Sequence, residues 1–93
     1  MEPRIAVRGE VDVATAPDLL RRLDESIDAH PGVPIVVDFR GVTFVDSTGL
    51  GVLVAAERRA RTNGGRLDVV NVTPAVRMVL EVTGLDKVLL APA

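Results

Sequence analysis

The chain has 93 residues, 47% of them hydrophobic and 26% charged, which fits one globular domain over residues 1–93 and leaves no room for a second core. Eleven basic and thirteen acidic side chains give a net charge of −2, so the basic surface that nucleic acid or an anionic membrane requires is absent. Cysteine is absent, which excludes disulfides and zinc–thiolate sites, and no apolar run suits a membrane span or a secretory signal, so we expect a cytoplasmic protein.

The first third of the chain predicts one strand and one helix. Residues 5–13 alternate apolar and polar side chains, as a strand does, with the turn-prone Gly9 among them. Thr15, Pro17 and Asp18 form a helix start, because threonine caps a helix, proline is tolerated in its first turn and a carboxylate favours that end. Apolar residues follow at helical spacing: Leu19, Leu20, Leu23 and Ile27. The helix is expected to stop at residues 30–32, His-Pro-Gly.

The middle of the chain predicts a buried strand and a second helix. Residues 33–39 are almost all apolar, which is typical of a strand that is buried on both faces, and we place its end at Asp38. After a polar turn, the second helix begins at Ser47, whose hydroxyl is expected to cap a free N–H group and to stabilise the helix by about 1 kcal/mol. Residues 63–65, Asn-Gly-Gly, end this helix.

Two glycines in the first turns of the second helix need a physical reason. Gly49 and Gly51 each cost a helix about 1 kcal/mol relative to alanine. They predict the close approach of another backbone or of a partner surface. Residues 52–56 are apolar around the whole circumference of the helix, and charged residues return only at Glu57. The helix is therefore expected to be enclosed in the core or half covered by a partner.

The last third continues the alternation of strands and helices. Residues 67–72 predict a strand, Thr73 and the proline after it start a third helix, and Gly84 ends that helix. The residues expected to face inward are Val76, Met78, Val79 and Leu80. Residues 87–91 predict the last strand. This alternation predicts right-handed crossovers and a single α/β domain, with a mostly parallel sheet of about four strands and three helices.

The sequence offers no convincing set of catalytic residues. Ser47 lacks the Gly-x-Ser-x-Gly context of a nucleophile elbow, and the single histidine, His30, lies at the end of the first helix, where it is no base for that serine. Complete glycine patterns for phosphate or dinucleotide binding are missing as well. Asp12, Asp38 and Asp46 could gather at the strand ends, but no lysine accompanies them in a suitable place. We expect no enzymatic activity, no catalytic residue, no metal and no cofactor.

Several short segments carry a resemblance to a known family. They are Gly-Glu-Val-Asp at residues 9–12, Asp-Phe at 38–39, Val-Asp-Ser-Thr-Gly-Leu-Gly at 45–51, Thr-Pro-Ala-Val at 73–76 and Thr-Gly-Leu at 83–85. In this order and spacing they resemble the STAS domain of anti-sigma factor antagonists. The resemblance extends over about residues 4–90, nearly the whole chain.

The resemblance implies a switch that works through protein partners. In that family the unphosphorylated antagonist binds an anti-sigma factor, which is also an ATP-dependent serine kinase, and so frees a sigma factor. The kinase phosphorylates the serine that matches Ser47, and a phosphatase removes the phosphate. Asp12 and Asp46 match acidic positions beside this serine, where they are expected to contact the kinase or orient the hydroxyl. The expected partner-binding residues are Asp12, Asp46, Thr48, Gly49 and Gly51.

The two ends of the chain depart from the family pattern. Members usually have one more strand before the first of these segments and one more helix after the last strand, and both are lacking here. We therefore expect an open sheet edge and self-association.

Two other functions stay open. One is a STAS-like scaffold or regulatory subunit, for example of a transporter ATPase, whose serine is not phosphorylated in a cycle. The other is an α/β module that binds a small anion at the helix N-terminus beside Ser47.

Overall fold

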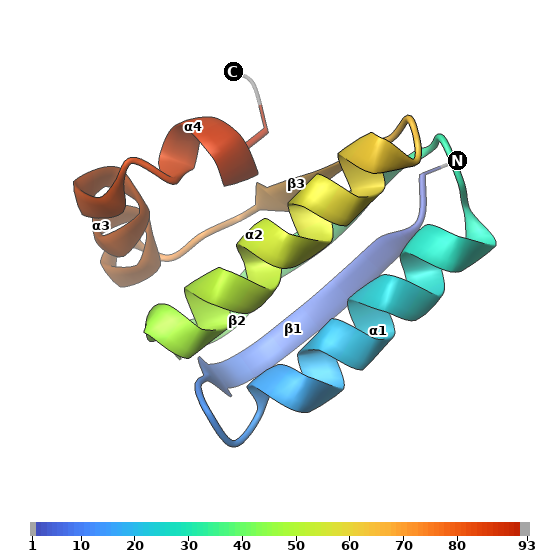
Figure 1. The fold of residues 1–93 in the computed structure, drawn as a ribbon. Helices are drawn as coiled ribbons and strands as arrows, with labels where there is room; N and C mark the ends of the chain where they lie inside the picture. The colour runs from blue at the N-terminus through green and yellow to red at the C-terminus, as the bar shows by residue number, and fades with distance from the viewer. Residues whose placement is uncertain (1, 92–93) are drawn as a thin grey trace.

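Three parallel strands form the centre of the computed structural model, which describes residues 2–91 (Figure 1). The strands follow one another across the sheet in chain order, β1-β2-β3. The elements are β1 (Arg4–Val11), α1 (Ala16–Ala29), β2 (Pro34–Val45), α2 (Ser47–Thr62), β3 (Arg66–Val70), α3 (Pro74–Thr83) and α4 (Asp86–Leu89). The predicted α/β class with a parallel sheet is confirmed, although the described residues contain three strands and four helices.

The helices α1 and α2 lie side by side on one face of the sheet (Figure 1). Each of these helices connects two neighbouring parallel strands. Such connections have the same handedness, and both move across the sheet in the same direction, so the two helices lie on the same face. Arg59 of α2 links the two helices through ion pairs with Asp24 (3.2 Å) and Asp28 (2.5 Å) of α1. The core fills the space between these helices and the sheet and includes the fully buried side chains Leu23, Ile27, Ile35, Phe39, Leu53 and Leu67.

The face of β2 that points away from α1 and α2 is only partly buried. Ile35 and Val37 are buried, whereas Asp38 alternates to the other side of the strand. Its carboxylate accepts a hydrogen bond from the backbone N–H of Arg40 (2.9 Å) and forms an ion pair with Arg4 (2.9 Å). The Arg40 bond and then the Arg4 bond lower the pKa of Asp38 to about 2. The prediction of a strand buried on both faces is therefore wrong, because helices cover only one side of it.

The strand β2 also extends beyond Asp38, where its end was predicted, as far as Val45. Its second half pairs with β1, so that Arg8 lies beside Gly41 and Val11 lies beside Val45. The pairing contains two irregularities, and one of them follows Gly9, which has a φ of 77°. Glycine adopts this conformation at little cost, and the extra residue at this point, Thr43, lies in β2, so that β2 bulges beside Gly9. Residues 40–45 are thus strand because β1 offers them a partner.

Local stop signals predict the ends of both long helices correctly. The helix α1 ends at Ala29, before residues 30–32, and α2 ends at Thr62, before residues 63–65. The prediction that Thr15 caps α1 is wrong. Thr15 precedes the helix, but its hydroxyl makes no capping hydrogen bond. That hydroxyl accepts from the N–H of Asp12 (3.0 Å) and donates to the carbonyl of Glu10 (2.8 Å). The threonine therefore shapes the loop between β1 and α1.

The helix α3 has the predicted boundaries, but one of its side chains was predicted on the wrong face. The hydroxyl of Thr73 accepts a hydrogen bond from the N–H of Val76 (3.4 Å), and Gly84 ends the helix with a φ of 75°. Val76 and Leu80 are buried as expected. Met78 was expected to face inward, but 65% of its surface is exposed. The two buried residues four positions apart already define the inner face, and Met78 lies outside it.

The predicted last strand is wrong. Residues 86–89 form the short helix α4, and only Leu90 bridges to β3, beside Val69. Leu85 and Leu89 both pack against the core, and one helical turn brings side chains four residues apart to the same side. Burial of these two leucines thus favours a helix here. Among residues 2–91, no helix combines the length and the apolar character that a membrane crossing requires.

Candidate functional site

The C-terminal ends of β1 and β2 bring Asp12 and Asp46 to the same edge of the sheet. Val11 and Val45, the last residues of the two strands, are paired neighbours. The N–H of Asp46 then donates to the carbonyl of Val11 (3.1 Å). Asp38 does not join them, because it lies in the middle of β2 and pairs with Arg4. Residues 2–91 contain no cluster of three or more carboxylates or histidines that could hold a metal ion.

Asp46, and not Ser47, caps the helix α2. The Asp46 backbone is extended, and its Oδ1 accepts a hydrogen bond from the N–H of Gly49 (3.0 Å). Ser47 is the first residue inside the helix and is exposed. The hydrogen bonds of residues 2–91 include none from its side chain. The predicted capping role of Ser47 is therefore wrong, and its hydroxyl is left free at a helix N-terminus.

Asp12 holds the loop between β1 and α1 in a tight turn. Its Oδ1 accepts hydrogen bonds from the N–H groups of Ala14 (3.0 Å) and Thr15 (3.1 Å). Aspartate commonly stabilises turns in this way. The carbonyl of Asp12 also accepts from the N–H of Ala16 (2.8 Å), at the start of α1. The half-buried carboxylate beside the Ser47 position thus has a structural task of its own.

The two glycines of α2 differ in what surrounds them. A Cβ on Gly49 would lie 2.6 Å from Val11 Cγ1, 2.7 Å from the Val11 carbonyl oxygen and 2.9 Å from Val45 Cγ2. Gly49 is buried, so the close approach predicted for it is to the strand ends, and its predicted contact with a partner is wrong. Gly51 is exposed, and nothing lies within 4 Å of the corresponding Cβ position. Ser47, Thr48 and Gly51 therefore form the outer surface that this turn offers to a partner.

The body of α2 contains a buried charge that was not predicted. Leu50, Leu53 and Ala56 face the core, but Glu57, expected on a polar face, is 1% exposed. Its Oε2 accepts from the N–H of Leu67 at the start of β3 (2.8 Å), and its Oε1 pairs with Arg61. The burial of Glu57 could have been predicted from its spacing, because a residue four positions after Leu53 lies on the same, inner face of the helix. This carboxylate ties α2 to β3.

Two exposed apolar side chains flank the strand ends and were not predicted as part of the site. Val13 follows β1 and is 70% exposed, and Phe44, beside the end of β2, is 51% exposed. The burial of Val42 and Val45 would have placed Phe44 on the outside of the strand. His30 is exposed at the opposite end of α1 from Thr15 and contributes nothing here. Exposed apolar groups within a polar surround, as here, are compatible with a protein-binding surface.

Comparison with known proteins gives the family. The model of a family described as "Mlab, STAS domain" matches residues 1–91. The anti-sigma F factor antagonist of Paenibacillus polymyxa is 31% identical over 85 residues, which cover 91% of this chain and 73% of that protein. The chain belongs to the STAS-domain family of anti-sigma factor antagonists. The function expected from the sequence is thereby confirmed at the level of the family.

Solved structures of STAS antagonists share the fold. The crystal structure of an anti-sigma factor antagonist from Mycobacterium paratuberculosis has a TM-score of 0.81 and 34% identity, covering 97% of this chain and 76% of that one. The antagonist SpoIIAA, known in an unphosphorylated and a phosphorylated form, matches with TM-scores of 0.79 and 0.70. Its identity is 24% and 23%, so it supports the fold alone; the matches cover 97% of this chain and 78% and 81% of those chains.

Proposed function

We propose that this STAS domain binds an anti-sigma factor through the Ser47 surface and that phosphorylation of Ser47 ends the complex. The Ser47 surface consists of Asp12, Asp46, Ser47, Thr48 and Gly51. The anti-sigma factor acts as the serine kinase, and a phosphatase restores the unphosphorylated form. This chain supplies the hydroxyl and the binding surface and no catalytic group. The observation that carries the proposal is the exposed Ser47 hydroxyl, free of hydrogen bonds within residues 2–91, at the start of a rigidly anchored helix.

The anchoring of this helix start supports recognition by a kinase. Gly49 rests on the strand ends, and the Asp46 N–H and carboxylate are both hydrogen-bonded. The hydroxyl of Ser47 therefore stands on a fixed platform rather than in a loose loop. A partner that binds this platform pays little to order it.

Charge explains why a phosphate would separate the partners. The ion pairs of residues 2–91 include neither Asp12 nor Asp46, so two carboxylates without a cationic partner lie at the same sheet edge as the serine. Phosphorylation adds about −1.5 to −2 charges at neutral pH. At a helix N-terminus this charge is favourable by roughly 0.3–1 kcal/mol, so the domain stays folded. Inside an interface, a loss of about 3 kcal/mol from the unpaired charge weakens binding by roughly 150-fold.

The comparison with SpoIIAA supports the expectation that the domain stays folded when it carries a phosphate. Its phosphorylated and unphosphorylated forms both have the fold of this chain. In that protein the phosphate and the STAS fold are therefore compatible. For this chain we expect the same compatibility at Ser47.

The test uses the anti-sigma factors encoded in the same genome. Each anti-sigma factor is incubated with the protein and ATP, and mass spectrometry locates any phosphate. The Ser47→Ala variant should remain unmodified, and the Thr48→Ala variant should be modified like the wild type. Calorimetry then compares affinities for the kinase that modifies the protein. We expect full affinity for Ser47→Ala, weaker binding for Ser47→Asp and the weakest for the phosphoprotein. Equal affinities for all forms would contradict the switch.

A second variant separates binding from phosphorylation. Gly51 has open space around it, so Gly51→Arg should fold normally and still lose the partner through a steric block. Circular dichroism checks the fold, and the same calorimetry measures binding. If the folded variant binds normally, the partner uses another surface. Recovery of a transporter ATPase instead of an anti-sigma factor, with no phosphate on Ser47, would favour the regulatory subunit without a phosphorylation cycle.

A further inference from the structure

The strand β1 has a free edge within residues 2–91. It pairs with β2 on one side, and the sheet order ends with it on the other. The carbonyl of Pro3 faces β2, because it accepts from the N–H of Val36 (2.9 Å). Backbone groups alternate in direction along a strand, so those of Arg4, Ala6 and Arg8 point outward. Unpaired outward groups of this kind invite a second strand.

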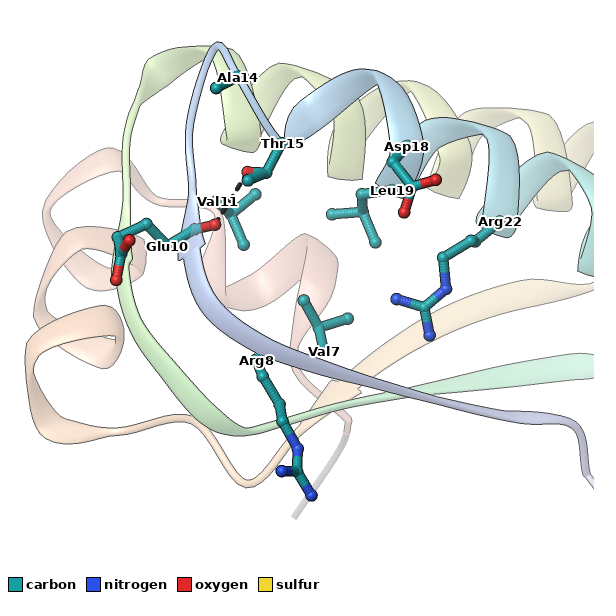
Figure 2. Close-up of a pocket in the computed structure, with 9 residues that line it drawn as sticks. All are labelled: Val7, Arg8, Glu10, Val11, Ala14, Thr15, Asp18, Leu19 and Arg22. Carbon is teal, nitrogen blue, oxygen red and sulfur yellow. Dashed lines mark hydrogen bonds between the residues drawn. The ribbon is translucent and has the colours of Figure 1, made fainter.

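Side chains of α1 already occupy two acceptors on this edge. The Arg22 guanidinium donates to the carbonyl of Ala6 (2.8 Å), and the Thr15 hydroxyl donates to the carbonyl of Glu10 (2.8 Å). Figure 2 shows Thr15 bonded at one end of the strand segment and Arg22 extended at the other. The two donors are seven residues apart: Thr15 immediately precedes α1, and Arg22 lies two turns further on, about 10 Å away along the helix axis. The two acceptors are separated by about 13 Å of strand, so the spacings nearly match.

The surroundings leave Arg22 free for this contact. Its neighbour Arg21 pairs with Asp18 (2.6 Å) and Glu25 (2.9 Å), whereas the ion pairs of residues 2–91 give Arg22 no carboxylate. Between the two bonds lies a groove of about 290 Å³, walled by β1 and α1 (Figure 2). An incoming strand that bonds to the Ala6 carbonyl would have to displace the guanidinium. The Ala6 carbonyl is therefore closed from within the molecule.

We propose that Arg22, assisted by Thr15, closes the edge of β1 and keeps the protein monomeric, in place of the self-association expected from the sequence, and that a second copy pairs with the edge when this contact is lost. An antiparallel pairing centred on Ala6 would let the two Ala6 residues exchange their N–H and carbonyl groups. This register is available only when the Ala6 carbonyl is free. It also places Arg4 opposite Arg8 of the second copy at both ends. These like charges oppose the pairing and add a second protection, which salt weakens.

The experiment compares Arg22→Met with the wild type by sedimentation velocity over a wide range of concentrations. Methionine keeps an aliphatic stem over the groove and removes the donor. We expect a monomeric wild type and a variant that dimerises at least about tenfold more tightly, more so in about 0.5 M NaCl. Arg21→Met is the matched control, since it loses two ion pairs on α1 and leaves the edge closed. It should stay monomeric.

A double variant identifies the surface. Proline is tolerated on an edge strand where its missing N–H faces outward, so Arg22→Met/Ala6→Pro should fold and be monomeric again. Hydrogen exchange gives the same information without proline, because the Ala6 amide of the Arg22→Met dimer should become protected. The proposal is overturned if Arg22→Met is as monomeric as the wild type, if the wild type is already dimeric, or if the dimer leaves the Ala6 amide unprotected.

Discussion

Replacement of Gly49 by alanine tests how α2 rests on the strand ends. The new Cβ would stand 2.6 Å from a Val11 methyl carbon and 2.7 Å from the Val11 carbonyl oxygen. The carbonyl belongs to the backbone and already accepts from Asp46, so it cannot turn away as a flexible side chain would. Overpacking costs about 1–3 kcal/mol, and these contacts place Gly49→Ala near the upper value. Alanine regains about 1 kcal/mol of helix propensity, which leaves a net loss of about 2 kcal/mol.

Gly51→Ala is the matched control for this substitution. It lies in the same helix, two residues further on, and its Cβ would meet nothing within 4 Å. The gain in helix propensity should therefore appear undiminished, and the free energy of unfolding should rise by up to about 1 kcal/mol. The two variants should differ by about 3 kcal/mol in total.

Urea unfolding followed by circular dichroism measures this difference. For a small domain with a slope of about 1–1.5 kcal/mol per molar urea, the midpoints of the two variants should lie about 2 M apart. The slopes should agree, since neither change alters the surface exposed on unfolding. Coinciding midpoints, or a more stable Gly49→Ala, would refute the packing of this helix start on β1 and β2.

Three further predictions concern single side chains. Asp46→Ala removes the cap of α2 and should lower the free energy of unfolding by about 1 kcal/mol, whereas Ser47→Ala should change it by less than about 0.5 kcal/mol. If urea unfolding shows the larger loss for Ser47→Ala, Ser47 and not Asp46 is the cap. Glu57→Ala should cost about 1–3 kcal/mol, because the buried N–H at the start of β3 loses its acceptor, and Glu57→Gln should recover much of that loss by the same measurement. Hydrogen bonds keep the pKa of Asp38 at about 2, below its ordinary 3.8, so its carboxylate stabilises the fold above about pH 4 and this contribution is lost as the pH falls toward 2. Asp38→Asn should therefore flatten the stability curve between about pH 4 and pH 2, and an unchanged curve in acid unfolding would disprove this role.

The place of the candidate site could be predicted from the sequence, but not the task of each residue. The order Asp46, Ser47 at the start of a helix, after a strand, indicates an exposed hydroxyl at the edge of a parallel sheet. Both Asp46 and Ser47 have side chains that suit a cap, and their local sequence does not distinguish them. The choice follows from the bond between the Asp46 N–H and Val11, which holds Asp46 in the extended conformation of a cap. That bond joins residues 35 positions apart.

The α/β class and the ends of the three longer helices can be predicted from the amino-acid sequence alone, because these features depend on neighbouring residues. The glycines, prolines and capping residues near positions 30, 63, 73 and 84 act within a few residues of where they stand. Three other features depend on long-range contacts: where β2 ends, that residues 86–89 form a helix, and that Gly49 is packed while Gly51 is open. Each of these depends on which distant segment lies alongside: β1 gives residues 40–45 a partner, the core takes up Leu89, and Val11 fills the space beside Gly49. A local pattern does not contain its distant partner, so these features arise only when the chain has folded.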